Sequence, residues 1–352
     1  MARIRLGILF GGRSAEFDVS LMSARSVWEA ADRTRFDLEP IAITRSGRWV
    51  FGTEAMDLLA HASRNGEITE AGHGTPIRSL EDLGRLDVVF PVLHGPFGED
   101  GSVQGMLEVI GVPYVGSGLL GSALGLDKLV QKGLWACKGL PVVEHAPVSR
   151  LEWESSPDNV LQDLLRSPGL PCFVKPANMG SSVGISRAET RAELISALEL
   201  ACRYDRRLIV EKAVQAREIE CGVLGNDRPE VSVPGEVFPG ANFYDYDAKY
   251  QPGRSRLRIP AVLPPSVTAE IRSMALRAFA TLDCAGMARV DFFLDKETGQ
   301  LWINELNTIP GFTPTSMFPK VWTESGVSYP ALITKLVDLA LERAGEQRRH
   351  TR

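Results

Sequence analysis

Cysteine and histidine are scarce in this sequence, and neither is clustered. The 352 residues include five cysteines and five histidines, with no C-x-x-C pair and no H-x-x-x-H pair. Disulfide frameworks and zinc knuckles depend on such spacing, so neither is expected. Reduced, buried thiols in a cytoplasmic protein are the simpler interpretation.

Long apolar runs and an excess of positive charge are also missing. No stretch approaches the roughly 18 uninterrupted apolar residues of a membrane span. The opening MARIRLGILFGG has too short an apolar run for a signal peptide and no small-residue cleavage site, so we expect a buried strand there. With 39 basic and 44 acidic residues the net charge is −5, and only the C-terminal tail is rich in arginine. We therefore expect neither a membrane nor a nucleic acid as a partner.

Two familiar nucleotide-binding loops have no counterpart where they would be expected. The chain has no G-x-x-x-x-G-K-[ST] loop, and the turn after the first predicted strand, Gly11-Gly12-Arg13-Ser14, does not follow G-x-G-x-x-G. Such loops supply backbone amides to phosphates in P-loop and dinucleotide-binding proteins. A nicotinamide-dependent oxidoreductase is therefore disfavoured.

The order of the apolar segments predicts an α/β protein of two or three domains. Hydrophobic residues make up 44% and charged residues 24%, as in ordinary folded proteins, and domains average roughly 150 residues. The first third alternates strands with helices, predicted at 5–10, 19–31, 38–44, 87–93, 104–110 and 112–115. This alternation indicates a parallel sheet with helices on both faces. Residues 45–80 are interpreted as a surface excursion.

The rest of the chain is predicted to hold a small α+β unit and a further hairpin. Short strands are expected at 172–175, 184–186, 208–211, 219–224 and 231–237, and a hairpin at 288–294 and 301–306. Helices are expected at 127–138, 190–204, 267–282 and 329–343, with a frayed tail after them. The segment 239–256 has no long periodic run, and a loop of that length is usually functional or disordered.

The predicted hairpin gathers charged and amide side chains. Because side chains alternate along a strand, Arg289 and Asp291 share one face, and so do Glu305 and Asn307. Carboxylates together with substrate phosphates are the ligands that Mg²⁺ prefers. A solvated, salt-bridged strand face would contain the same residue types, so the hairpin alone leaves both interpretations open.

Four other segments could bind a ligand. Lys175 ends an apolar strand before a loop of small residues, which would let backbone amides approach phosphates; a plain Gly-Ser hairpin is the alternative. Glu16 follows the first strand at the sheet edge where α/β proteins bind ligands, or it caps the next helix. His94 opens a second glycine-rich loop and is either structural or catalytic. The aromatic segment 243–250 either contacts a ligand or packs on its own domain.

Together these segments resemble the D-alanine–D-alanine ligase family of the ATP-grasp superfamily. The matching pieces appear in the family's order and span residues 4 to about 343: GGRSAEFDVSLMSA (11–24), HGPFGEDGSVQGMLE (94–108), GLDKLVQK (125–132), VKPANMGSSVGIS (174–186), IVEK (209–212), FYDYDAKY (243–250), GMARVDFFLD (286–295) and INELNTIPGFTPTSMFP (303–319). The resemblance implies a three-domain ATP-grasp fold. Its domains would be an N-terminal α/β domain at 1–125, a central domain at 126–216 and a C-terminal domain at 217–352. ATP would lie between the last two, which are α+β domains, and the loop 239–256 would act as a lid.

The resemblance also implies the cofactors and their binding residues. Two Mg²⁺ ions, or Mn²⁺, would bind Asp291, Glu305 and Asn307. Lys128 and Lys175 would pair with the α- and β-phosphates of ATP, and Lys249 would approach the γ-phosphate. The carboxylate of Glu211 and the backbone of Val214 would hold the adenine, and Glu218 the ribose. Ser182, Lys212 and Phe293 complete the implied nucleotide-binding set.

The implied substrates are two D-alanines, joined through a D-alanyl phosphate for peptidoglycan synthesis. Arg289 and the Gly311 amide would form an oxyanion hole. Glu16 would bind the ammonium of the first D-alanine, with His94 beside it, and Ser316 would bind the carboxylate of the second. Ser181 and Tyr250 would link Glu16 to the lid. A cytoplasmic homodimer is expected.

Two alternatives to this assignment remain. A sister ligase that makes D-alanyl-D-lactate or D-alanyl-D-serine would have the same fold and metal site, although Tyr250 goes with an amino acid as second substrate in this family. A non-catalytic ATP-grasp binding module would be expected to lose an acidic metal ligand or Arg289, and none is lost.

Overall fold

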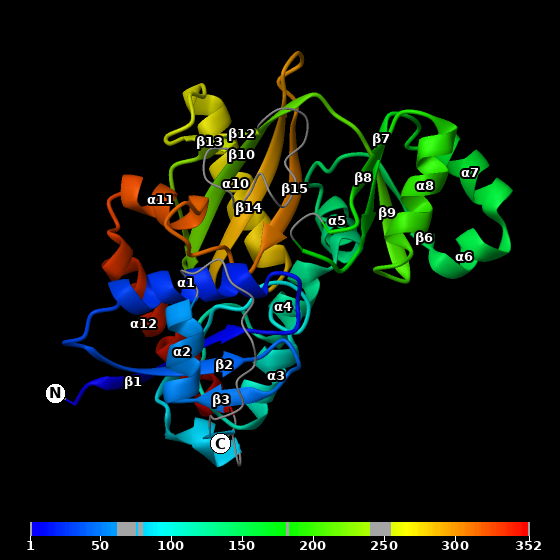
Figure 1. The fold of residues 1–352 in the computed structure, drawn as a ribbon. Coiled ribbons are helices and arrows are strands. Elements are labelled where there is room, and N and C mark those ends of the chain that lie inside the picture. Colours follow the sequence, from blue (N-terminus) through cyan, green and yellow to red (C-terminus); the bar gives the residue numbers. More distant parts are fainter. Residues whose placement is uncertain (1, 62–74, 77–79, 181–182, 240–254, 351–352) are drawn as a thin grey trace.

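The described part of the chain forms three β-sheets, and helices pack against each of them (Figure 1). The computed structural model describes residues 2–61, 75–76, 80–180, 183–239 and 255–350. Within these ranges no helix is both long and apolar enough to cross a membrane.

The first sheet confirms the parallel arrangement and adds an antiparallel edge. Its order is β4-β3-β2-β1-β5. Strands β1 (Ile4–Gly11), β2 (Phe36–Ile43) and β5 (Val88–Pro91) run parallel. Strands β3 (Trp49–Phe51) and β4 (Thr75–Pro76) add an antiparallel edge. The interpretation of 45–80 as a mere surface excursion is therefore wrong, because this segment extends the sheet.

Helices surround the first sheet and lead to the second. They are α1 (Phe17–Ala30), α2 (Thr53–His61), the 3-10 helix η1 (Leu80–Arg85), α3 (Ser102–Val109), α4 (Leu119–Leu126) and α5 (Lys128–Cys137). The strand predicted at 112–115 forms only one parallel bridge, Val89 to Tyr114. Asp127 caps α5 by accepting the Val130 N–H at 3.0 Å, and the start of this helix lies beside the residues that form the candidate site.

The central sheet is small and wholly antiparallel, with the order β6-β9-β7-β8. Its strands are β6 (His145–Ser149), β7 (Cys172–Pro176), β8 (Ser186–Ala188) and β9 (Arg207–Lys212), and its helices are α6 (Arg150–Ser155), α7 (Pro157–Arg166) and α8 (Arg191–Ala201). Capping boxes begin α6 at Ser149 and α8 at Thr190. β7, β9 and α8 were predicted from the sequence, whereas β6, α6 and α7 were not; these three elements are short and bury few side chains.

The third sheet has the order β13-β12-β10-β14-β15, with β11 paired to β10. Its strands are β10 (Ala216–Gly225), β11 (Glu230–Val231), β12 (Gly235–Pro239), β13 (Ser255–Arg258), β14 (Gly286–Asp295) and β15 (Leu301–Asn307). The helices are α10 (Pro265–Thr281), α11 (Met317–Glu324) and α12 (Tyr329–His350). Helix α12 continues to His350, within the tail that was expected to fray from 344 onward.

One hydrophobic core joins the first and third sheets. It contains Leu6 and Phe36 of the first sheet, Leu224 and Met287 of the third, and Leu336 of α12. Helix α12 is held further by Arg343, which donates to the carbonyl of Tyr114 at 3.1 Å. The two ends of the chain therefore fold together, and the loop that follows β15 is enclosed between them. The domain boundaries at 125 and 216 stay a prediction.

Substitution of Leu336 tests this shared core. Leu336→Ala removes a fully buried side chain, so we expect a loss of about 2–5 kcal/mol in the free energy of unfolding. Amide exchange should accelerate in β1 and α12 together. Leu151→Ala, at a side chain that is 73% exposed, is the control and should shift stability by no more than about 0.5 kcal/mol. Faster exchange confined to α12 would contradict a shared core.

Candidate functional site

A row of carboxylates crosses three neighbouring strands of the third sheet. Glu220 of β10 pairs in register with Asp291 of β14, and Asp291 pairs with Glu305 of β15. Residues that lie directly opposite share a face of the sheet. Arg289 and Asn307 form the next row on that face. The charged face predicted from the hairpin is therefore present, and it includes Glu220, which the sequence analysis missed.

A β-bulge in the β14–β15 pair turns the side chains of Glu305 and Asn307 toward this face. The register of β14 and β15 shifts between Asp291, which pairs with Glu305, and Phe292, which pairs with Ile303. One extra residue reverses the faces that follow it. Ile303 and Leu306 are consequently both buried in the core, while Glu305 and Asn307 point to the opposite side. Strict alternation would have placed Ile303 and Glu305 on one face.

Arg289 compensates part of the negative charge in the row. Its guanidinium makes two hydrogen bonds to Asp291, at 2.7 and 2.6 Å, and an ion pair with Glu220 at 3.0 Å. Burial disfavours its charged form, but the carboxylates of Asp291 and Glu220 outweigh burial and raise the pKa of Arg289 well above its ordinary value. The guanidinium therefore stays positively charged and fixed in orientation.

Asp291, Glu305 and Asn307 could hold a divalent metal. Two carboxylates and a carboxamide supply the oxygen ligands that Mg²⁺ selects, and Mg²⁺ takes further oxygens from water and phosphates. Asn307 now donates from Nδ2 to Asp291 at 3.1 Å, which places the two side chains in contact. Nowhere in the described ranges do three or more His, Cys, Asp or Glu side chains form a metal cluster by themselves. The amide oxygen and oxygens from a ligand are thus needed to complete the site.

A buried cluster of lysines and a glutamate lies in the central sheet. Lys175 of β7 forms an ion pair with Glu211 of β9, and Lys132 of α5 lies 2.7 Å from the other Glu211 oxygen. Burial opposes ionisation of Glu211, but the two ammonium groups overcome it and hold its pKa below the usual range. Lys132 was missed by the sequence analysis. Its position one helical turn after Lys128 was the available signal.

Lys128 connects the central part to the metal-ligand set. Its ammonium donates to the carbonyl of Met179 at 2.7 Å and lies 3.7 Å from Glu305. It therefore lies between the loop after β7 and the carboxylate row. A cation in this place can neutralise an anionic ligand together with a metal ion.

Glu16 lies where the first and central parts of the chain approach each other. It is buried at the start of α1. A Cβ added to Gly95 or to Gly180 would come within 2.5 Å of its carboxylate oxygen. Only glycine allows this approach, so both glycine-rich loops noted in the sequence reach the same carboxylate.

His94 and Glu99 connect the loop after β5 to the loop after β15. The ring of His94 contacts the Ile309 carbonyl at 3.2 Å and the Ser23 hydroxyl at 3.3 Å. Burial lowers the pKa of His94 to about 4. Glu99 accepts the N–H of Gly95 at 2.7 Å and of Ile309 at 3.3 Å. Burial, followed by the nearby Glu16 charge, raises the pKa of Glu99 to about 8. Glu99 was also missed.

The other predicted residues fall in three groups. Gly311 and Ser316 lie close together, since a Cβ on Gly311 would come 2.7 Å from the Ser316 hydroxyl. Glu218 pairs in register with Phe293, on the face of the third sheet that carries Asp291. Val214 follows the end of β9, and the side chain of Lys212 is exposed and lies 3.7 Å from Glu144. Ser181, Ser182, Lys249 and Tyr250 lie outside the described residues.

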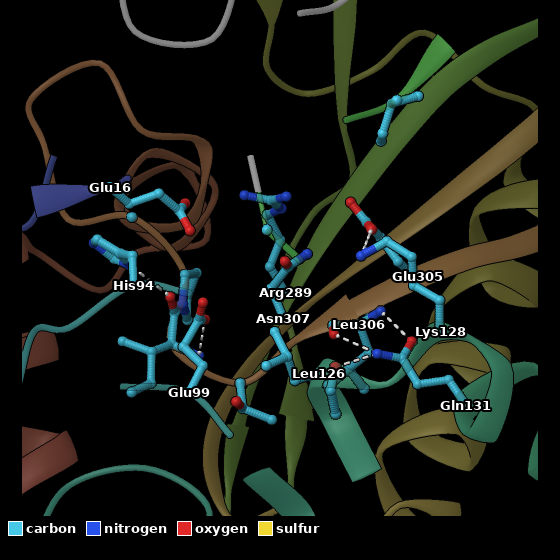
Figure 2. Close-up of a pocket in the computed structure, with 17 residues that line it drawn as sticks. Glu16, His94, Glu99, Leu126, Lys128, Gln131, Arg289, Glu305, Leu306 and Asn307 are labelled. Carbon is cyan, nitrogen blue, oxygen red and sulfur yellow. Dashed lines mark hydrogen bonds and ion pairs between the residues drawn. The ribbon is translucent and has the colours of Figure 1, made fainter. Parts of the chain in front are cut away.

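Several of the residues described above line one pocket (Figure 2). Its walls include Glu16, His94, Glu99, Lys128, Arg289, Glu305, Asn307 and Gly311. The pocket lies at the junction of all three sheets. It has carboxylates on both sides and the Arg289 guanidinium between them, which is an arrangement for a ligand that has both positive and negative groups.

Comparisons with known proteins agree along the whole chain. Residues 5–117 match the family model for the D-ala D-ala ligase N-terminus, and residues 134–338 match that for the C-terminus. A D-alanine–D-alanine ligase of Natranaerobius thermophilus is 45% identical over 100% of this chain and 98% of its own.

Solved structures of the same kind are also similar. The D-alanine–D-alanine ligase of Coxiella burnetii has a TM-score of 0.86 and 35% identity, covering 100% of this chain and 97% of its own. VanG, a D-Ala:D-Ser ligase of Enterococcus faecalis, has a TM-score of 0.84 and 34% identity, covering 96% of this chain and 100% of its own. The ATP-grasp fold class is confirmed, and the chain belongs to the D-ala D-ala ligase family.

Proposed function

We propose that this protein joins two D-alanines to D-alanyl-D-alanine at the expense of ATP, for peptidoglycan synthesis. The observation that carries the proposal is the pocket that Glu16 lines together with Arg289, Glu305 and Asn307, in a chain that is 45% identical from end to end to a D-alanine–D-alanine ligase. An amino acid bound by its ammonium at Glu16 would direct its carboxylate toward the cations.

The reaction divides into two steps. The carboxylate of the first D-alanine attacks the γ-phosphorus of ATP, the bond to ADP breaks, and D-alanyl phosphate forms. The amine of the second D-alanine then attacks the acyl carbon, loses a proton, and expels phosphate. Arg289 and the Gly311 amide stabilise the negative charge on the acyl oxygen. Ser316 orients the second carboxylate.

The nucleotide is placed by the central and third sheets. Lys128 and Lys175 bind its phosphates, and Glu211 and Val214 hold the adenine, with Glu218 at the ribose. Ser182, Lys212 and Phe293 complete the contacts, and Lys249 approaches the γ-phosphate. Asp291, Glu305 and Asn307 would hold two Mg²⁺ ions, or Mn²⁺, which supply charge neutralisation to the phosphates. Ser181 and Tyr250 would link Glu16 to the lid, which excludes water from the acyl phosphate.

D-Alanine–D-serine ligation is the second candidate. It is favoured by the likeness to the VanG D-Ala:D-Ser ligase, with a TM-score of 0.84. A ligase that forms D-alanyl-D-lactate would need the same fold, and a non-catalytic module is disfavoured because Arg289 and the acidic ligands are all present.

We place the enzyme in the cytoplasm, where ATP is supplied and where its five free cysteines would stay reduced. A homodimer is supported by exposed apolar side chains on α3 and α4, at Val109, Leu119 and Leu120.

Phosphate release is the direct test of the reaction. We expect release from ATP to require Mg²⁺ and D-alanine together, with D-alanyl-D-alanine as the product. D-Serine and D-lactate, each supplied with D-alanine, separate the alternatives by product mass. Equal turnover with L-alanine, or no turnover with any D-amino acid, would refute the ligase assignment.

Glu305→Gln tests the metal-ligand role. The substitution keeps the shape of the side chain but removes one negative charge from the carboxylate row. Turnover should fall at least about 100-fold at ordinary Mg²⁺, because charge stabilisation of the phosphates is lost, while the melting temperature stays close to that of the wild type. Glu297→Gln, in the exposed turn between β14 and β15, is the matched control. Near-normal turnover of folded Glu305→Gln would exclude Glu305 as a ligand.

His94 is proposed to act by hydrogen bonding and not by charge. Its pKa of about 4 lies below the value of about 6.5 in an unfolded chain. The unfolded chain therefore binds the additional proton between those pH values, and stability should fall as pH drops through this window, by at most about 1.4 kcal/mol per pH unit from this group. His94→Gln should reduce the slope of stability against pH there. An unchanged slope in urea titrations from pH 4 to 7 would contradict a buried neutral ring.

A further inference from the structure

Gln131 of α5 makes contacts that the proposed mechanism has not used. Its side chain is 2% exposed and reaches the backbone of β15. The amide oxygen accepts the N–H of Leu306 at 3.0 Å, and the amide nitrogen donates to the Leu306 carbonyl at 3.2 Å. The same nitrogen donates to the carbonyl of Gly125. The amide nitrogen of Gln131 therefore donates two hydrogen bonds, and its amide oxygen accepts one (Figure 2).

Gln131 contacts β15 where the strand has few backbone hydrogen bonds to neighbouring strands. β15 is the edge of its sheet, and among the described residues its outer side has an isolated bridge from Val142 to Ile303 in place of a further strand. The bulge lies just before Glu305, and a bulge disrupts the local hydrogen-bond ladder. The outer edge is held at Ile303, whose N–H donates to the Pro141 carbonyl at 2.9 Å. Leu306, three residues later, is held by Gln131.

Leu306 lies between two of the residues that would bind metal. Its side chain points into the core, so its neighbours Glu305 and Asn307 point to the site. A rotation of the backbone at Leu306 would therefore turn both metal-binding side chains together. A side-chain carboxamide can accept and donate in the geometry of a peptide group, and at this point it does what a further strand would do.

We propose that Gln131 is a positioning residue for the divalent cation: by pairing with both backbone groups of Leu306 it fixes the direction of Glu305 and Asn307. The inference rests on the proposed metal site but not on the identity of the amino-acid substrates. Lys128 lies on the same helix, and its ammonium is 3.7 Å from Glu305. Helix α5 would therefore fix the position of the Lys128 ammonium relative to the metal ligands Glu305 and Asn307.

Two variants separate hydrogen bonding from packing. Gln131→Met keeps the length of the side chain and removes both bonds to Leu306. Gln131→Glu keeps an acceptor for the Leu306 N–H but presents an oxygen to the two carbonyls. Gln162→Met, at an exposed position of α7, is the matched control.

Mn²⁺ binding gives a readout that does not need turnover. It is measured by electron paramagnetic resonance, with a non-hydrolysable ATP analogue present. We expect about tenfold weaker Mn²⁺ binding in Gln131→Met, the effect of one to two ordinary hydrogen bonds, and at least that in Gln131→Glu. In phosphate release the Mg²⁺ requirement should rise, and turnover should recover at saturating Mg²⁺. A general structural defect would instead lower turnover at every Mg²⁺ concentration.

Hydrogen exchange of the wild-type protein tests the same proposal without a variant. The Leu306 amide should exchange slowly in the absence of ligand, and faster by at least about tenfold in Gln131→Met. Unchanged Mn²⁺ affinity in a folded Gln131→Met variant would overturn the proposal. If neither variant folds, rapid exchange of Leu306 in the wild type would overturn it. If the wild-type protein binds Mn²⁺ but does not ligate D-alanine, the result would count against the proposed function alone.

Discussion

The charge balance on one face of the third sheet is the constraint on which the site depends. Glu220, Asp291 and Glu305 lie side by side across three strands, and the Arg289 guanidinium pairs with two of them. Buried charges without compensation cost several kcal/mol, so such a row persists only where cations complete it. Lys128, at 3.7 Å from Glu305, supplies part of the remaining positive charge. A divalent cation with its phosphates would bring further positive charge and oxygen ligands to this face.

The fold brings distant segments to that face by sharing cores and loops. The first and third sheets have one hydrophobic core, and the loop after β15 is held between them through the contacts of His94 and Glu99 with Ile309. Helix α5 joins the central and third sheets, with Lys132 paired to Glu211 and Gln131 paired to Leu306. The pocket is thus a junction of three sheets, and binding and positioning residues come from each of them.

Much of the fold could be predicted because its signals are local. The βαβ order of the first third, the helices α8 and α10, and the β14–β15 hairpin follow from apolar periodicity. The short strands β3, β4 and β6 and the helices α6 and α7 could not be recognised, since their apolar faces are small. The face shared by Arg289 and Asp291 was predicted by strand alternation. The bulge that turns Glu305 away from Ile303 was not, because it depends on the register between two strands.

Residues that act through other residues were the ones missed. Glu99 and Lys132 lie inside segments that were singled out, but nothing local distinguishes a buried carboxylate that accepts two backbone amides from an exposed one. Glu220 alternates with the buried Ile219 and Cys221 in β10. Its place in the carboxylate row can be recognised only from the register that sets Asp291 opposite it. The roles of Ser181, Ser182, Lys249 and Tyr250 stay predictions from the family resemblance.

A crystal structure grown with Mn²⁺ and a non-hydrolysable ATP analogue would test the central claim most directly. Anomalous scattering locates Mn²⁺ without reference to any assumed role. The account predicts peaks within coordination distance of Asp291, Glu305 and Asn307, with the carboxylate of Asp291 shared between metal and Arg289. Peaks elsewhere, or an analogue bound with no metal on this face, would contradict it.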